Sequence, residues 1–463
     1  MVFSSLVFLF LFLPAVIIIN YWLPSNYRNG FLLFANLVFY AYGEPVYVIL
    51  MVLSIGANYV FARMLDPVQH RISEGARKAV LILSVLFNIG MLVYFKYTML
   101  ILDTLRMVPF LSNLPYMDIV LPIGISFYTF QALSYVIDVY RRDCRCTRNF
   151  IDFGAYISLF PQLIAGPIVR YSDVASRMRT RQVSFDMFSS GIKVFVVGLA
   201  KKVLLANQFG IVWDTVSGNL SAYGTLGAWI GAIAYAMQIY FDFGGYSDMA
   251  RGLGKMLGFD FCINFSYPYI STTVTEFWRR WHISLSTWFR DYVYIPLGGN
   301  RTSLLRNALN ILIVWALTGI WHGAGWNFLA WGIYYGIILL CEKFIYGKLL
   351  KKLPGVVGNI YTLFIVVVGW IFFVCPDFTS AFQYLKVMFV PQGGSVLRLI
   401  PWWFTFVVGA ISCTPLCTAL LGTAKIKVKG IRFVEAVLCL AGFVLCIASL
   451  VTETYNPFIY FQF

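Results

Sequence analysis

The residue with the clearest potential for chemistry is His322, which follows an apolar run over residues 308–321. A titratable side chain inside an apolar segment is costly unless it faces a cavity or a polar partner, so it indicates a functional site. Gly319, Gly323 and Gly325 surround it and leave room for a substrate or a neighbouring backbone. Because imidazole titrates near neutral pH, His322 suits general acid–base catalysis. The alternative is a packing histidine that bonds a carbonyl of an adjacent helix.

The other two histidines differ in their surroundings. His282 follows Trp281 in a tryptophan-rich segment. His282 either belongs to a functional site or lies among lipid headgroups at the membrane interface. The surrounding sequence leaves both interpretations open. His70 lies among charged residues, which is typical of a solvated loop.

Asp242 and Asp248 flank the glycine pair 244–245 near the end of an apolar segment. The glycines predict a helix break, whose exposed amides could hold an anion such as phosphate. The simpler interpretation is a capped turn in which the acids pair with Arg251 or Lys255. We favour that simpler role for Asp248, whereas the role of Asp242 stays open.

Lys201 and Lys202 are adjacent cations inside another apolar segment. Two ammonium groups at mid-membrane are costly, which predicts either a broken helix or a wet cavity that accepts anions. The sequence has no phosphate-binding loop, zinc-ligand pair or nucleophile elbow. Its nine cysteines are scattered, so we expect no metal site.

The elements that must position these residues are membrane helices. Of the 463 residues 60% are apolar and only 12% are charged, against about 25% charged residues in soluble domains. Apolar runs of about 18 residues or more recur along the chain. We predict an all-α, polytopic membrane protein of about 11–12 transmembrane helices, forming one integral-membrane domain over residues 1–463. Spans are expected near 3–23, 30–42, 45–62, 79–97, 119–137, 187–207, 225–243, 303–321, 326–342, 356–375, 401–421 and 433–452.

The net charge of +15 is explained by membrane topology. With the N-terminus outside, most Lys and Arg residues fall in loops on the inner side, as in multi-span proteins generally. The expected partner is therefore the lipid bilayer, and no nucleic acid is expected. Residues 1–22 have neither a positive N-terminal region nor a small-residue cleavage site, so we expect a retained first span rather than a secretory signal.

Two segments depart from simple spans. Residues 150–168 are apolar but interrupted by Pro161, Gly166 and Pro167 between arginine-rich segments. This pattern predicts a re-entrant stretch that enters and leaves on the same face. Residues 274–292 carry aromatic side chains at three- and four-residue steps and charges on the remaining positions. That pattern predicts one amphipathic helix in the membrane interface.

Motifs spread over nearly the whole chain carry a family resemblance. They are LPIGISFYTFQ at 121–131, FPQLIAGP at 160–167, GLAKK at 198–202, YFDFGGYSD at 240–248, EFWRRWH at 276–282, YIPLGGNR at 294–301, GIWHG at 319–323 and NPFIYFQF at 456–463. Together they resemble the membrane-bound O-acyltransferases, and within them the bacterial branch typified by the alginate O-acetylation membrane protein.

The resemblance implies an active site and a reaction. His322 would be the active-site histidine and His282 a second catalytic-site residue. Tilted helices would surround a thinned centre, where a cytoplasmic tunnel meets an outer cavity at the histidine. The implied donor is acetyl-CoA, with no cofactor bound permanently and His322 as general base on an incoming hydroxyl. Residues expected to contact the donor are Lys201, Lys202, Arg279, Arg280, Trp278, Trp281 and Asp242.

The resemblance also implies a partner and a location. In this branch the acetyl group usually passes to an extracytoplasmic partner that modifies an exopolysaccharide or a cell-wall polymer. We therefore expect a separate acetyltransferase or accessory protein, and a multi-pass location in the cytoplasmic membrane.

Three other functions compete with this one. Within the family, the alternative is D-alanyl transfer to teichoic acid from a phosphopantetheine carrier protein. The chain length and the YFQF ending favour the acetylation branch. A polysaccharide transporter would often show inverted repeats, and we find none in the sequence. A passive scaffold of a secretory complex would not depend on His322.

Overall fold

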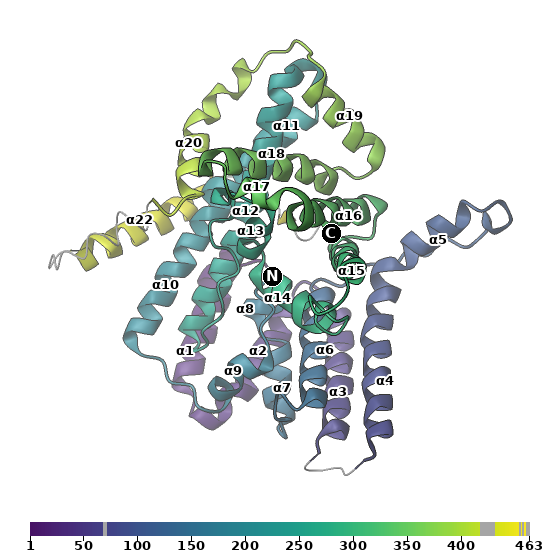
Figure 1. Cartoon of the computed structure of the whole chain (residues 1–463). Coiled ribbons are helices and arrows are strands. Elements are labelled where there is room, and N and C mark those ends of the chain that lie inside the picture. Colours follow the sequence, from purple (N-terminus) through teal and green to yellow (C-terminus); the bar gives the residue numbers. More distant parts are fainter. Residues whose placement is uncertain (68–71, 417–430, 453–454, 456–457, 460–463) are drawn as a thin grey trace. The chain divides into compact units, whose positions relative to one another are not determined.

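The computed structural model describes residues 1–67, 72–416, 431–452, 455, 458 and 459. Within these residues the fold is all-helical and contains no strand, as predicted (Figure 1). The solvated-loop prediction for His70 lies outside them. Two compact units are present: Met1–Phe195 with Met249–Cys262, and Val196–Asp248 with Ile263–Phe463. We describe each unit by itself, and the single domain over 1–463 stays a prediction.

Seven helical segments in the described part of the chain are long and apolar enough to cross a membrane. They are Tyr47–Leu65, Glu74–Arg106, Phe185–Ser217, Leu304–His322, Trp326–Leu350, Gly355–Val374 and Phe433–Thr452. Four other predicted spans coincide with helices that are shorter or less apolar, as at Phe8–Trp22, whereas the span predicted at 401–421 lies partly outside the described residues. The chain is therefore a multi-pass membrane protein.

The first unit is built from helices around a broken, buried segment. Its helices are α1 (Leu13–Trp22), α2 (Ser25–Ala41), α3 (Tyr47–Leu65), α4 (Glu74–Leu92), α5 (Thr98–Arg106), α6 (Ile125–Arg141), α7 (Phe150–Ile157), α8 (Phe160–Leu163), α9 (Tyr171–Arg179) and the start of α10 (Phe185–Ala200). Helices α3, α4 and α6 lie side by side (Figure 1). Asn58 and Asn88 exchange amide hydrogen bonds of 3.1 and 2.8 Å between α3 and α4.

The predicted re-entrant segment is indeed interrupted. Helix α7 ends at Ile157, and the short α8 begins with Pro161 in its first turn. Asn36 of α2 satisfies the freed backbone, because its side chain accepts from the N–H of Phe160 at 3.1 Å and donates to the carbonyl of Ala155 at 3.3 Å. Non-helical backbone is tolerated at membrane depth when it is buried in this way. A return to the same membrane face stays a prediction.

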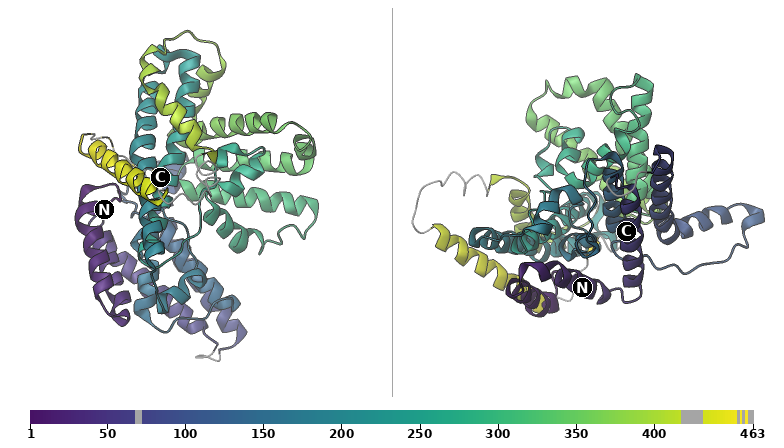
Figure 2. Two further views of the ribbon diagram at one scale, coloured as in Figure 1. Left: turned by 90° about the vertical axis from the view of Figure 1, so that its left-hand side faces the viewer. Right: turned by 90° about the horizontal axis from the view of Figure 1, so that it is seen from below.

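The second unit contains the residues singled out for chemistry. Its helices are the end of α10, α11 (Asn207–Ser217), most of α12 (Leu220–Met256), α13 (Val274–Arg280), α14 (Ile283–Phe289), α15 (Leu304–His322), α16 (Trp326–Cys341), α17 (Gly347–Leu350), α18 (Gly355–Val374), α19 (Phe378–Phe389), α20 (Trp403–Ser412) and α22 (Ile431–Thr452). Helices α15 and α16 pair closely, and α18 packs on α16 (Figure 2).

The prediction of one amphipathic helix over residues 274–292 is wrong. The segment forms two helices, α13 and α14, separated at Trp281 and His282. His282 has the left-handed backbone angles φ 45° and ψ 55°, which end the helical repeat. The aromatic side chains of the segment 274–292 are buried in the protein. Their helical spacing therefore indicated a buried aromatic face, but it could not predict the turn between the two helices.

The helix break predicted at residues 244–245 is also wrong. Helix α12 continues through both glycines, and its only non-helical residue is Gly224. Gly245 instead allows a close approach to α10, since a β-carbon there would lie 2.7 Å from the carbonyl oxygen of Gly198. A β-carbon on Gly244 would meet its nearest neighbour only at 3.9 Å. One glycine of the pair thus serves helix packing.

These two glycines make a matched pair of variants. Gly245→Ala should lower the stability of the purified protein by about 1–3 kcal/mol, because the added methyl group overpacks the contact between α10 and α12. Gly244→Ala should leave it unchanged or slightly higher, because alanine favours the helix. Thermal unfolding in detergent measures both, and equal midpoints for the two variants would contradict the packing assignment.

Candidate functional site

His322 is the last residue of α15 and only 6% exposed. Its ring lies among those of Trp321, Trp331 and Phe373, at centroid distances of 5.0, 5.2 and 5.3 Å. Gly319, one turn earlier, lets α16 approach, since a β-carbon there would lie 2.2 Å from the carbonyl oxygen of Phe328. The imidazole is thus held in an aromatic cage at a tight helix–helix contact.

A large cavity of about 1050 Å³ reaches His322 and also His282. Its wall comes from residues 273–300, from α15 and from the segment 339–351. Two kinds of residue meet in it: indole and aliphatic side chains in its interior, and basic side chains that are exposed at the surface. The basic residues are Arg279, Arg290, Lys343, Lys348 and Lys351.

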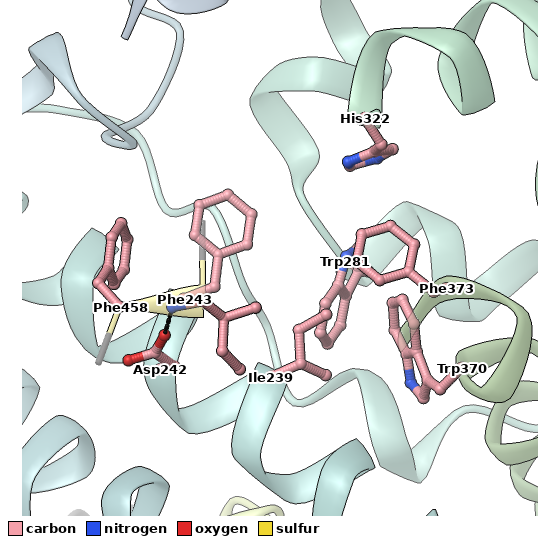
Figure 3. Close-up of a pocket in the computed structure, with 9 residues that line it drawn as sticks. Ile239, Asp242, Phe243, Trp281, His322, Trp370, Phe373 and Phe458 are labelled. Carbon is pink, nitrogen blue, oxygen red and sulfur yellow. Dashed lines mark hydrogen bonds between the residues drawn. The ribbon is translucent and has the colours of Figure 1, made fainter. Parts of the chain in front are cut away.

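A second, much smaller pocket of about 10 Å³ also touches His322. Figure 3 shows His322 at one end, above Trp281, Phe373 and Trp370, with Asp242 and Phe458 at the other end. Its lining is almost entirely apolar, and its volume is about that of one water molecule. His322 therefore lines both a roomy cavity with basic residues and a narrow apolar pocket.

His282 is buried at the turn between α13 and α14, beside Asn264. The Asn264 Oδ1 accepts from the backbone N–H and the hydroxyl of Ser284, at 3.0 and 2.9 Å. The Nδ1 of His282 lies 3.3 Å from the same oxygen, so Nδ1 must carry a hydrogen, because two lone pairs would repel. Burial lowers the pKa of His282 to about 3. Its ring is therefore neutral, with Nε2 as the unprotonated nitrogen.

The turn itself is held by Asn264 and its neighbours. The carbonyl of Asn264 accepts from the N–H of Ile283 at 3.0 Å, and the N–H of Ser266 donates to the carbonyl of Arg280 at 2.9 Å. These bonds replace the helical ones lost at the break. A non-glycine residue with positive φ persists only where its surroundings impose it, and such residues cluster at functional sites.

The residues predicted to contact the donor do not all line the same cavity of the second unit. Trp278 and Arg279 line the large cavity with both histidines, whereas Trp281 and Asp242 line the small pocket. Arg280 is not part of either lining, and its guanidinium pairs with Glu276 at 2.9 Å. As donor contacts, all of them stay predictions.

Lys201 and Lys202 are paired with acids and line neither cavity. Lys201 Nζ lies 2.7 Å from Asp248, and Lys202 Nζ lies 2.7 Å from Asp242. The second pair is almost fully buried, with side chains 4% and 2% exposed. The helix is not broken there but widened into a π-helical turn, η4 (Lys201–Ala206). Asp242 and Asp248 thus have these lysines as partners, and their expected pairing with Arg251 or Lys255 stays a prediction.

Asp242 carries a second bond that sequence patterns could not foretell. Its Oδ2 accepts the backbone N–H of Ile459 at 2.8 Å (Figure 3). The ring of Phe458 stacks on Tyr246 at 4.8 Å. Residues close to the C-terminus therefore help to line the small pocket beside His322.

Sequence reasoning missed the lysines of the large cavity. Lys343, Lys348 and Lys351 lie in a basic stretch that membrane topology already explained, so their number carried no separate signal of a site. Asn264 was also missed, because a single asparagine in a loop has no distinguishing pattern. In the described part of the chain, no group of three or more His, Cys, Asp or Glu residues could hold a metal ion.

Comparisons with known proteins place these features in context. The family model of the membrane-bound O-acyltransferases matches residues 145–382. A probable alginate O-acetylase of Azotobacter vinelandii is 42% identical over 84% of this chain and 78% of its own length. A peptidoglycan O-acetyltransferase of Helicobacter pylori is 32% identical over 86% and 82%. A teichoic acid D-alanyltransferase of Bacillus subtilis is 26% identical over 58% and 72%.

The buried ion pair of Lys202 offers a test of its role. Lys202→Met should lower stability by about 3–5 kcal/mol, because it leaves the Asp242 carboxylate buried without its cation. The double variant Lys202→Met/Asp242→Asn should regain most of that loss, since asparagine can still accept from Ile459. Thermal unfolding of the purified variants measures this. Unchanged stability together with weaker donor binding would instead make Lys202 a donor contact.

Proposed function

Since the chain belongs to the membrane-bound O-acyltransferase family, and is thus an acyltransferase, we propose that it moves acetyl groups from cytoplasmic acetyl-CoA to an extracellular or cell-wall polysaccharide. The observation that carries this proposal is the position of His322, buried at the meeting point of the two cavities. A base placed there can act on a hydroxyl while a thioester is held in the larger cavity.

The large cavity has the properties that an acyl-CoA requires. Its exposed basic residues suit the pyrophosphate and 3′-phosphate of coenzyme A, whereas its indole and aliphatic lining suits the pantetheine arm. The residues that form its basic part, 279–300 and 343–351, are those that charge distribution assigns to the cytoplasmic side. This supports entry of the donor from the cytoplasm.

The transfer can be written with His322 as the general base. Its imidazole takes the proton of the acceptor hydroxyl, and the oxygen attacks the thioester carbonyl carbon. A C–O bond forms, the C–S bond breaks, and the thiolate of coenzyme A recovers the proton from the imidazolium.

His282 supports this reaction as a neutral hydrogen-bonding group. Asn264 orients the ring through Nδ1, which leaves Nε2 as an acceptor on a residue that lines the large cavity. We assign proton abstraction to His322 because it lines both cavities, and to His282, which lines only the large one, the orientation of the donor or the acceptor.

The proposal extends to the location and the partner. A multi-pass acyltransferase that uses cytoplasmic acetyl-CoA belongs in the cytoplasmic membrane. The polysaccharide lies outside, so a separate extracytoplasmic acetyltransferase or accessory protein would receive the acetyl group. The relatives named alginate O-acetylase and peptidoglycan O-acetyltransferase support an extracellular polymer as the final acceptor.

Replacement of His322 by alanine tests the proposed base. His322→Ala should reduce acetyl transfer by about 10²–10⁴-fold, because a positioned general base contributes a factor of that size. Acetyl-ester content of the surface polymer and turnover of acetyl-CoA by purified protein measure it. His322→Gln, which keeps a polar side chain of similar length, should be equally inactive and should unfold at the wild-type midpoint.

Other outcomes would assign a different function. Turnover of a D-alanyl carrier protein but not of acetyl-CoA would identify D-alanyl transfer. Loss of polymer secretion in His322→Ala would identify a transporter. Unchanged acetylation in His322→Ala would indicate that the protein is a passive scaffold of a secretory complex and that His322 is not catalytic.

The basic residues of the large cavity predict how the donor is recognised. The double variant Lys348→Gln/Lys351→Gln should raise the KM for acetyl-CoA about tenfold, because each lost charge weakens contact with the phosphates. It should leave the kinetics with S-acetyl-N-acetylcysteamine unchanged, because this thioester carries no phosphate. An equal loss with both donors would contradict phosphate recognition by these lysines.

A further inference from the structure

Glu342 places a buried carboxylate at the edge of the large cavity. It is the first residue of the π-helical turn η7 (Glu342–Tyr346), which follows α16, and it is 6% exposed. Its Oε1 accepts the N–H of Val274 at 2.7 Å, and its Oε2 accepts the N–H of Thr275 at 2.8 Å. The hydroxyl of Thr275 donates to Oε2 at 2.5 Å, and that of Tyr361 donates to Oε1 at 3.2 Å.

These bonds complete the start of α13. The first N–H groups of a helix have no partner within the helix and must be satisfied from outside. Thr273 accepts the N–H of Glu276 at 3.0 Å through its side chain, as a capping residue does. Glu342 supplies acceptors for the N–H groups of the first two residues of the helix, Val274 and Thr275. A negative charge also interacts favourably with the N-terminus of a helix.

A carboxylate at this place cannot easily serve a substrate as well. Burying a charge is costly unless hydrogen bonds compensate, and here four donors surround the two oxygen atoms. Both oxygens are thus engaged by α13 and by α18, the helix that carries Tyr361. Glu342 lines the cavity, yet its bonding directs it to the protein and away from the donor.

Helix α13 carries much of the site that Glu342 can influence. Trp278 and Arg279 of α13 line the large cavity, and the helix ends at the turn that contains His282. Lys343, the residue after Glu342, contacts the start of α15 and the segment before it. Its Nζ donates to Asn307 at 2.6 Å and to Asn300 at 2.8 Å. Two adjacent residues of η7 therefore tie α13 and the start of α15 to the end of α16.

We propose that Glu342 is a positioning residue for acyl transfer, which holds α13 so that Arg279 and His282 keep their places in the donor cavity. The inference rests on the proposed function, since it assigns the large cavity to the acyl donor. Glu342 touches no reacting atom in this account. It acts through the helix whose first two N–H groups it binds.

Glu342→Gln tests this role with little change in size. The amide can accept from only one of the two N–H groups, and its NH₂ group faces the other donor, so α13 loses its fixed start. We expect kcat/KM for acetyl-CoA to fall about tenfold, mainly through KM, because small misplacements of binding groups are costly. Hydrogen exchange at residues 274–282 should accelerate.

Asp377→Asn is the matched control. Asp377 caps α19 by accepting the N–H of Ser380 at 2.8 Å, and it lines neither of the two cavities. Asparagine can still accept the N–H of Ser380 but removes the negative charge at the start of α19, so the variant should weaken the cap yet keep its kcat/KM within twofold. A kinetic loss in Asp377→Asn as large as that in Glu342→Gln would show a general effect of removing a charge from a helix start and would overturn the proposal.

A milder variant covers the case in which Glu342→Gln does not fold. Thr275→Val removes only the hydroxyl bond and keeps both backbone bonds, so it should raise KM about two- to threefold with faster exchange at 274–282. Unchanged exchange and KM in Thr275→Val would overturn the positioning role. If the wild-type protein does not turn over acetyl-CoA, the proposed donor is wrong, whereas the exchange measurement still decides whether Glu342 holds α13.

Discussion

The turn at Trp281 and His282 depends on Asn264, and the geometry of the site depends on that turn. The side-chain oxygen of Asn264 binds Ser284 and faces His282, while its carbonyl binds the N–H of Ile283. The aromatic spacing of the segment by itself fits one amphipathic helix without a turn. Because the turn interrupts it, His282 enters the cavity that also contains His322. The turn that the Asn264 side chain holds thus allows residues of both α13 and α14 to line the large cavity.

The same physical constraint governs the other polar groups of the second unit. In an apolar helical bundle each buried charge needs a partner, and each exposed helix start needs an acceptor. Lys202 forms an ion pair with Asp242, and Glu342 accepts hydrogen bonds from the first two residues of α13. Five exposed basic residues, Arg279, Arg290, Lys343, Lys348 and Lys351, lie around the large cavity, and other exposed basic residues lie elsewhere in the unit. Charges are thus divided between those that stabilise the fold and those open to a ligand.

Several features could be predicted from the sequence with good accuracy. The all-helical fold and the multi-pass membrane character follow from apolar runs, because the bilayer leaves few alternatives to helices. The interruption at Pro161 follows from the missing N–H of proline. The two failures share one cause. The glycine pair 244–245 and the aromatic face of 274–292 have meanings that depend on neighbouring helices, which local spacing does not contain.

The sequence by itself determined the class of protein and the approximate position of its helices, and it singled out His322, whose catalytic role is our proposal. An embedded histidine among glycines is unusual enough to be recognised without neighbours, and the motifs around it indicate an O-acyltransferase. Only the tertiary structure decided which polar residues share a cavity with His322. In the folded chain, Lys201 and Lys202 pair with acids, and Lys348 and Lys351 line the large cavity. Glu342 accepts hydrogen bonds from the start of α13. The physical reason is that the role of a buried charge depends on its partner, and partners lie as far apart along the chain as the 217 positions between Asp242 and Ile459.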